Sequence, residues 1–244
     1  MPLTSTEVLI IEFVGVPSAG KSTVASRLGD DLRQRGYAVY EPTYRVDHEF
    51  GGLRRVVWKF WTAGAWAIKR PHVAAAWLNG IVRSRQPSMR VALRLVLNAW
   101  YVSGTLARAA KVSGVHILDQ GLAQSIWSVM YSGGRFKSSS FVRLFEATIP
   151  DCAMGLVLLE IDDLDALVRR LADRKALGRS RIDHLVRAGK DVRADVLRAN
   201  NVYKSLIETL TPSVSKIDWI STIKVDAMAD PAASVEKIRR ALLP

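Results

Sequence analysis

Residues 15 to 23 have the sequence GVPSAGKST, in which two glycines five positions apart precede Lys21 and Ser22. Glycines at this spacing let backbone N–H groups turn inward around a phosphate group. The lysine ammonium can then bridge two phosphates, and the serine hydroxyl can bind Mg²⁺. The residues that we expect to contact a nucleotide phosphate are Gly15, Ser18, Ala19, Gly20, Lys21, Ser22 and Thr23.

The segments on either side of this loop agree with a phosphate site. Val8 to Val14 is an apolar run of strand length, and apolar residues recur at helical spacing from Thr23 to Arg35. A loop between a strand and a helix N-terminus lies where the helix dipole favours negative charge. A Gly-rich turn that matched the pattern by chance would not account for these flanks.

Two acidic residues follow predicted strands, at the edge of a parallel sheet where ligands bind. Asp119 ends an apolar run of strand length, and Glu41 follows the short run from Tyr37 to Tyr40. Asp119 could hold Mg²⁺, or it could cap the helix that begins near Gly121. Glu41 could accept a proton from an attacking hydroxyl, or it could face water. We favour a role for both in phosphoryl transfer.

Five arginines occur between positions 169 and 181, after a predicted strand and helix. Arg170 and Arg174 are four residues apart, so they share one face of a helix. Two guanidinium groups placed in this way can reach phosphate oxygens when a flap closes over a site. A solvated basic face is the alternative. We favour a lid over about residues 165 to 190.

With 244 residues, the chain is long enough for one domain with a substantial core. A strand, a helix and a second strand at its start predict the α/β class, with helices covering a parallel sheet. Further strands are expected at 115–119, 153–161 and 219–225. Further helices are expected at 54–70, 73–85, 90–111, 121–131, 141–148, 163–172, 186–210 and 231–242.

The composition favours a cytoplasmic protein. A single cysteine, Cys152, excludes an internal disulfide framework and fits a reducing compartment. No uncharged apolar run reaches the ~18 residues needed to span a bilayer. The first apolar run is short and lacks the basic segment of a secretory leader.

Most of the net charge of +12 lies between Arg45 and Lys111, which hold twelve Lys or Arg residues, two acids and five of the seven tryptophans. The segment is interpreted first as a helical subdomain for the phosphoryl acceptor, with Trp in the core and long cationic side chains outside. A membrane-surface patch is the second interpretation. Contact with nucleic acid is the third.

Together these features resemble the thymidylate kinase and deoxynucleoside kinase branch of the P-loop kinases. Besides the loop, the resemblance rests on Tyr40-Glu41-Pro42, Leu118-Asp119-Gln120-Gly121, the pair Arg170 and Arg174, and Arg181-Ile182-Asp183. These elements keep the family's order over nearly the whole chain.

The resemblance implies a three-layer P-loop NTPase fold, with a five-stranded parallel sheet and helices on both faces. It implies ATP and Mg²⁺ as cofactors and a nucleoside or nucleoside monophosphate as acceptor. The residues that it assigns to phosphoryl transfer are Lys21, Glu41, Asp119, Arg170 and Arg174. It also implies that Ser22 and Asp119 hold the metal and that Arg181 contacts the nucleotide.

Two departures from the family pattern affect the acceptor side. Gln120 stands where the family has an arginine, and Pro17 stands where thymidylate kinases carry an acid. A kinase of a sugar or a lipid-linked acceptor is therefore a further alternative. The alternative from another class is a nucleotide-binding ATPase or switch that contacts a membrane or nucleic acid through residues 45–111. A homodimer is also considered.

Overall fold

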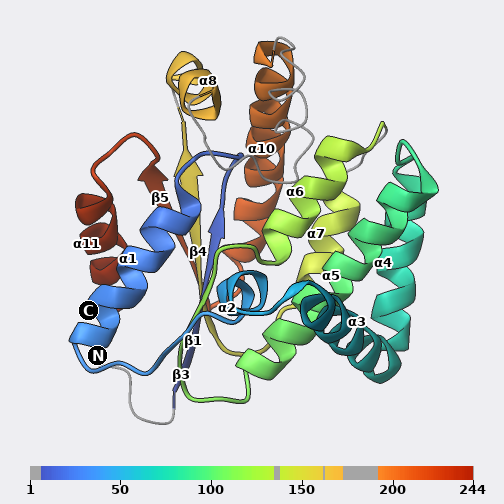
Figure 1. The fold of residues 1–244 in the computed structure, drawn as a ribbon, viewed down its shortest axis with the longest axis horizontal. Coiled ribbons are helices and arrows are strands. Elements are labelled where there is room, and N and C mark those ends of the chain that lie inside the picture. Colours follow the sequence, from blue (N-terminus) through green and yellow to red (C-terminus); the bar gives the residue numbers. More distant parts are fainter. Residues whose placement is uncertain (1–6, 135–137, 162, 173–191, 244) are drawn as a thin grey trace.

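Five parallel strands form one sheet in the computed structural model, which describes residues 7–134, 138–161, 163–172 and 192–243. The strands are β1 (Val8–Val14), β2 (Val39–Tyr40), β3 (Gly114–Leu118), β4 (Ala153–Glu160) and β5 (Ile220–Asp226). Their order is β2-β3-β1-β4-β5, which places β1 at the centre (Figure 1). The predicted five-stranded parallel sheet is confirmed, although β2 begins at Val39 and not at Tyr37.

The central strand β1 is buried from Leu9 onward because helices cover both faces of the sheet. Its sequence is accordingly a nearly continuous apolar run. Glu12 is the exception: it has no solvent exposure and pairs in register with Leu118 of β3 and Leu156 of β4. A carboxyl group in such a position needs hydrogen-bond donors from another element.

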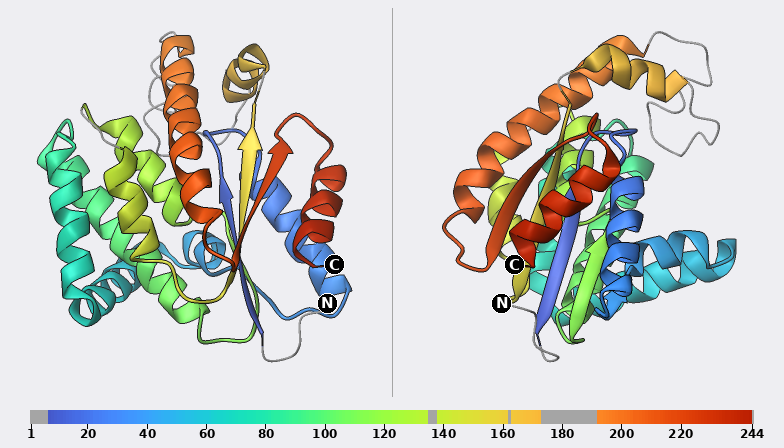
Figure 2. Two further views of the ribbon diagram at one scale, coloured as in Figure 1. Left: turned by 180° about the vertical axis from the view of Figure 1, so that it is seen from behind. Right: turned by 90° about the vertical axis from the view of Figure 1, so that its left-hand side faces the viewer.

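Helices on both faces of the sheet give the molecule three layers (Figures 1 and 2). On one face, α1 (Lys21–Gln34) and α11 (Pro231–Leu242) lie side by side. The other face carries α5 (Met89–Ala109), α6 (Leu122–Ser132) and α10 (Arg193–Val214). Two shorter helices, α7 (Ser138–Glu146) and α8 (Leu164–Ala172), pack against α10. The expected α/β three-layer fold is therefore present.

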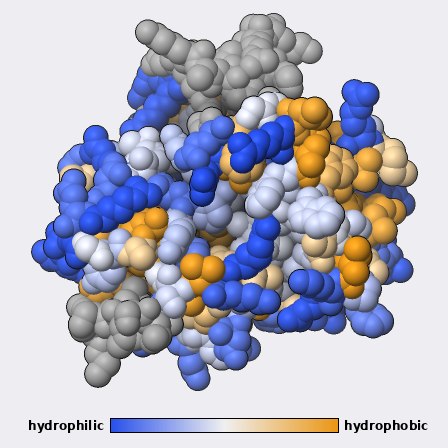
Figure 3. Space-filling view, turned by 60° about the horizontal axis from the view of Figure 1, so that its bottom comes forward, coloured by the Kyte–Doolittle hydropathy of each residue, from blue (hydrophilic) through white to orange (hydrophobic). Residues whose placement is uncertain are grey.

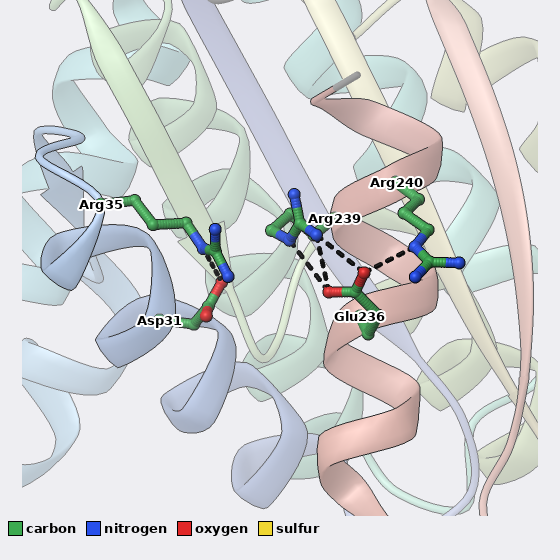
Figure 4. Close-up of polar contacts among 5 residues, drawn as sticks. All are labelled: Asp31, Arg35, Glu236, Arg239 and Arg240. Carbon is green, nitrogen blue, oxygen red and sulfur yellow. Dashed lines mark hydrogen bonds and ion pairs between the residues drawn. The ribbon is translucent and has the colours of Figure 1, made fainter.

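Ion pairs lie on the outer side of the layer formed by α1 and α11 (Figure 4). On α1, Arg35 Nε lies 3.0 Å from Asp31 Oδ2. On α11, Glu236 accepts from Arg239 Nη2 at 2.7 Å and from Arg240 Nε at 2.5 Å. Solvent screens such exposed pairs, so they add little stability. The layer is held mainly by its buried apolar residues, which include Leu28, Leu32, Val235 and Ile238.

Several helix boundaries differ from the sequence-based expectation, among them those at Pro42 and Pro212. Pro42 was expected to end an extended segment, but it starts α2 (Pro42–His48), because a proline fits the first turn, where the N–H has no helical partner. The helix expected to end at Leu210 continues through Pro212 to Val214. Burial of Val214 in the core favours this last turn despite the hydrogen bond lost at the proline.

The basic, Trp-rich segment forms α3 (Gly52–Lys69), α4 (Pro71–Arg83) and α5. Trp66 and Trp77 lie in the core, as expected. The expectation is wrong for Trp58 and Trp61, whose exposed fractions are 38% and 71%. None of the helices in the described part of the chain is long and apolar enough to cross a membrane.

Candidate functional site

The loop between β1 and α1 adopts the geometry of a phosphate cradle. Gly20 precedes α1 with φ 87°, a left-handed conformation that glycine adopts without strain, and Ser18 has φ 64°. No side chain caps the N-terminus of α1, and its first turn holds no acidic residue. The first N–H groups of this helix are therefore available to an anion, and its dipole favours one.

Two side chains of the loop fit a phosphate ligand. Lys21 Nζ donates hydrogen bonds to Gly15 O at 2.7 Å and Val16 O at 2.9 Å, which holds the ammonium group over the start of the loop. The Ser18 hydroxyl is buried and makes no hydrogen bond within the described residues. A buried polar atom in this state is costly, and a phosphate oxygen would satisfy it.

Asp119, at the end of β3, lies next to the first turn of α1. Its Oδ2 is 3.4 Å from Ser22 Oγ, and its Oδ1 accepts a hydrogen bond from Thr43 Oγ1 at 2.8 Å. The structure thus brings together the two residues predicted to hold Mg²⁺. Sequence reasoning missed Thr43, whose only signal was its place directly after Glu41-Pro42.

A hydroxyl and a single carboxylate fit the way Mg²⁺ is usually bound. This ion keeps several waters and takes one or two carboxylates together with substrate phosphates. Residues 7–134, 138–161, 163–172 and 192–243 contain no cluster of three or more His, Cys, Asp or Glu side chains suited to a metal. The donor set at Ser22 and Asp119 therefore suits a metal that arrives with a nucleotide.

Glu41 lies apart from the loop in this structure. Its carboxylate forms an ion pair with Arg33 on α1 and lies beside Gly29, where an added Cβ would be 3.4 Å from Glu41 Cδ. Gly29 is two helical turns, or about 12 Å, beyond Lys21. Glu41 is thus placed beside the middle of α1 and not at the phosphate cradle.

The structure describes only the start of the predicted lid. Arg170 lies on α8, and its guanidinium donates to Ala227 O, just beyond β5, at 2.9 Å. Arg174 and Arg181 lie outside the described residues. The lid therefore stays a prediction.

Glu12 connects the sheet to the phosphate loop, a role that sequence reasoning missed. Its Oε1 accepts a hydrogen bond from Gln124 N at 3.0 Å, and the amides of Leu122 and Ala123 also face it. The carboxyl group thereby caps the N-terminus of α6 from a neighbouring strand. The side chain of Gln124 then accepts a hydrogen bond from Gly15 N at 3.1 Å. The position of the loop thus depends on Glu12 through α6.

Comparisons with known proteins find solved structures with a similar fold but no relative in sequence. No protein-family model matches the chain, and no curated protein is similar to it in sequence. Among solved structures, deoxyadenosine kinase from M. mycoides with bound dATP matches with a TM-score of 0.52 at 14% identity, over 95% of this chain and 97% of that chain. The chain therefore shares the fold of this solved structure. EHV4-TK complexed with TP4A matches with a TM-score of 0.45 at 12% identity, over 97% and 91% of the two chains.

Burial in the central strand controls the ionisation of Glu12. It raises the pKa of the carboxyl group to about 7, although the facing amides of Gln124, Leu122 and Ala123 lower it in part. Since the pKa is higher in the folded than in the unfolded chain, the folded state binds the proton more tightly. This group therefore makes the protein less stable as the pH rises from about 4.5 to about 7.

We expect Glu12→Gln to remove this pH dependence, because the amide keeps an acceptor for α6 but does not ionise. The free energy of unfolding of the wild type should fall relative to the variant by about 2–3 kcal/mol between about pH 5 and about pH 8. Urea denaturation of both proteins at the two pH values measures this. A constant difference between them would show that Glu12 does not titrate in the folded protein.

Proposed function

We propose that the protein is an ATP-dependent kinase that transfers the γ-phosphoryl group to a small polar acceptor, with a nucleoside or nucleoside monophosphate as the expected class. The observation that carries the proposal is the uncapped N-terminus of α1, where Ser22 Oγ in the first turn lies 3.4 Å from Asp119 Oδ2. The shared fold with a deoxyadenosine kinase supports the acceptor class.

The donor side uses the loop, Lys21, Ser22 and Asp119. Magnesium-bound ATP supplies the phosphoryl group, together with metal charge that offsets charge on the phosphate oxygens. The loop amides, the Lys21 ammonium and the Ser18 hydroxyl bind and orient the phosphates. Ser22 and Asp119 would hold the metal, and the hydrogen bond from Thr43 fixes the orientation of the Asp119 carboxylate.

On the acceptor side, Glu41 receives the proton of the attacking hydroxyl at a carboxylate oxygen. The new P–O bond forms as the bond from phosphorus to the bridging oxygen of the donor breaks, and that oxygen stays with the diphosphate. This role requires the Glu41 side chain to leave Arg33 and to turn from its place beside Gly29 toward the phosphate loop. Arg170, Arg174 and Arg181 bind phosphate oxygens on closure of the lid, for which Arg170 releases Ala227 O.

A screen of nucleosides, nucleoside monophosphates and sugars with γ-labelled ATP tests the proposal. We expect a labelled product that requires both the acceptor and Mg²⁺ and that disappears when a chelator is added. A labelled sugar would support the proposal that the protein is a kinase, but it would show that the acceptor is a sugar and not a nucleoside or nucleotide. Slow ATP hydrolysis without any phosphorylated acceptor would contradict the kinase and favour a nucleotide-dependent switch.

A further inference from the structure

The outer face of α3 is apolar where a surface helix is normally polar. The apolar residues of this face are separated by one, three, four or seven positions, so they lie along one side of the helix. Their exposed fractions are 80% for Leu53, 58% for Val57, 54% for Phe60, 71% for Trp61 and 82% for Ile68. We call these five residues the α3 stripe. Figure 3 shows hydrophobic residues gathered on the side of the molecule where α3 and α4 lie, with hydrophilic residues next to them.

The stripe does not result from a loosely attached helix. The opposite side of α3 packs tightly against α5, where Thr62 and Trp66 approach Gly104. A Cβ added to Gly104 would lie 2.8 Å from Thr62 O, so the two helices touch closely here. The apolar stripe is therefore held in place on the surface of the fold.

A basic pocket of about 430 Å³ adjoins the stripe, and Trp61 belongs to both. Its cationic lining residues are Lys69, Arg70, Arg108 and Lys111, against one acid, Asp151. No carboxylate in the described part of the chain forms an ion pair with any of these four side chains. Among the lining residues the pocket therefore carries a net positive charge.

Arg108 shows this imbalance most clearly. Its guanidinium donates to Thr62 Oγ1 at 2.6 Å and lies over the Trp58 ring, 5.1 Å from the ring centre. Partial burial lowers its pKa, since these neighbours carry no negative charge. An anion in the pocket would compensate the charge.

The pocket lies at the end of the sheet opposite the phosphate loop. The pocket is lined by the last turn of α5 and by residues 147–151, which lead into the N-terminal ends of β3 and β4. The phosphate loop follows the C-terminal end of β1, and the strands are parallel. The pocket is therefore distinct from the candidate active site.

We propose that the α3 stripe and the basic pocket together bind the surface of an anionic phospholipid bilayer. A helix with exposed Trp, Phe and Leu beside clustered Lys and Arg lies in the plane of the membrane interface, with its apolar side among the acyl chains. The pocket cations then bind the lipid phosphates. The anchor is peripheral, and it leaves the opposite end of the sheet open to water.

Charge and chemistry favour this occupant over two others. A two-fold dimer would cover the stripe, but the second copy presents the same basic patch and so brings no cluster of negative charge to the pocket. Nucleic acid could neutralise the pocket, but its phosphate backbone offers no apolar surface to cover Leu53, Val57 and Ile68. An anionic bilayer offers acyl chains to the apolar stripe and lipid phosphates to the basic pocket.

Co-sedimentation of the full chain with phospholipid vesicles tests the proposal. We expect binding to phosphatidylcholine vesicles that contain phosphatidylglycerol, weakening as salt rises, and no binding to phosphatidylcholine alone. The triple variant Lys69→Gln, Arg70→Gln, Lys111→Gln should bind about a hundredfold more weakly. The matched variant Lys204→Gln, Lys216→Gln, Lys237→Gln removes the same charge from exposed sites elsewhere and should bind as the wild type does.

The apolar half is tested by Phe60→Ser with Ile68→Ser, which changes exposed residues only and should abolish vesicle binding while the circular dichroism spectrum is kept. Equal weakening by the two charge variants would overturn the proposal, since it would mean that net charge alone acts. Binding of a DNA oligonucleotide but not of vesicles would overturn it as well. So would sedimentation velocity that shows a dimer dependent on Phe60 and Ile68, with no vesicle binding.

Discussion

Lys21→Ala is expected to lower the rate of phosphoryl transfer by about a thousandfold or more, because it removes an ammonium group placed over the phosphate loop. Little stability should be lost. The side chain is only partly buried, and its two hydrogen bonds to Gly15 O and Val16 O contribute about 2 kcal/mol at most. A large loss of activity in a folded protein is the signature of a residue that acts on the transferring group.

The measurement is turnover of γ-labelled ATP with the acceptor found in the screen, or basal ATP hydrolysis if no acceptor is found. Lys204→Ala is the matched control, since it removes an exposed lysine on α10, away from the loop. Thermal melting of all three proteins checks the fold. Undiminished turnover in Lys21→Ala would contradict both the proposed kinase activity and the proposal that this loop binds the nucleotide phosphates.

The donor half of the site could be predicted because its determinants are local. One strand, one loop and one helix occupy residues 8–34 without a break, and each has its own signature in the sequence. Asp119 could be placed as well, since the carboxyl ends of parallel strands meet at one edge of a sheet. Its contact with Ser22 then follows from the neighbouring positions of β1 and β3.

The direction of the Glu41 side chain could not be predicted. Its position after β2 follows from the strand pattern, but its partner depends on the side-chain conformation chosen against α1. Arg33 lies eight residues earlier, across the turn between α1 and β2, and the two groups pair. A pattern of residue types records that an acid is present, not which of several nearby cations it meets.

The role of Glu12 could not be predicted from the sequence for a different reason. It interrupts an apolar strand, which marks it as unusual, but the amide that it binds belongs to Gln124, 112 residues further along the chain. Only the packing of α6 against β1 brings the two together. No local signal in the sequence records this contact, although a buried acid in a central strand is itself a reason to look for donors.

Gly121→Ala is expected to be among the most destabilising single-methyl changes in this chain. A Cβ at position 121 would lie 2.1 Å from Glu12 Cδ and 2.5 Å from its Oε2. Glu12 is fully buried, so it cannot move aside into solvent. The variant must displace the carboxyl group from the amides of α6 and disturb Gln124 and Gly15, at a cost of about 3 kcal/mol.

Gly64→Ala is the matched control for a methyl added to a glycine. This residue lies inside α3, and apart from the adjoining backbone of that helix no atom lies within 4 Å of an added Cβ, so alanine should be neutral or stabilising by up to about 1 kcal/mol. Urea denaturation at one pH gives the free energy of unfolding for each variant. Equal effects at positions 64 and 121 would mean that Gly121 is not in contact with Glu12.

A double-mutant cycle then isolates the contact. Glu12→Ala removes the side chain that the new methyl would strike, so the double variant Glu12→Ala, Gly121→Ala should be more stable than the sum of the two single losses predicts. We expect a coupling free energy of about 1–3 kcal/mol in this direction. Strictly additive losses would show that Gly121 is required by its own backbone conformation, and the proposed link from Glu12 through α6 to the phosphate loop would lose its steric support.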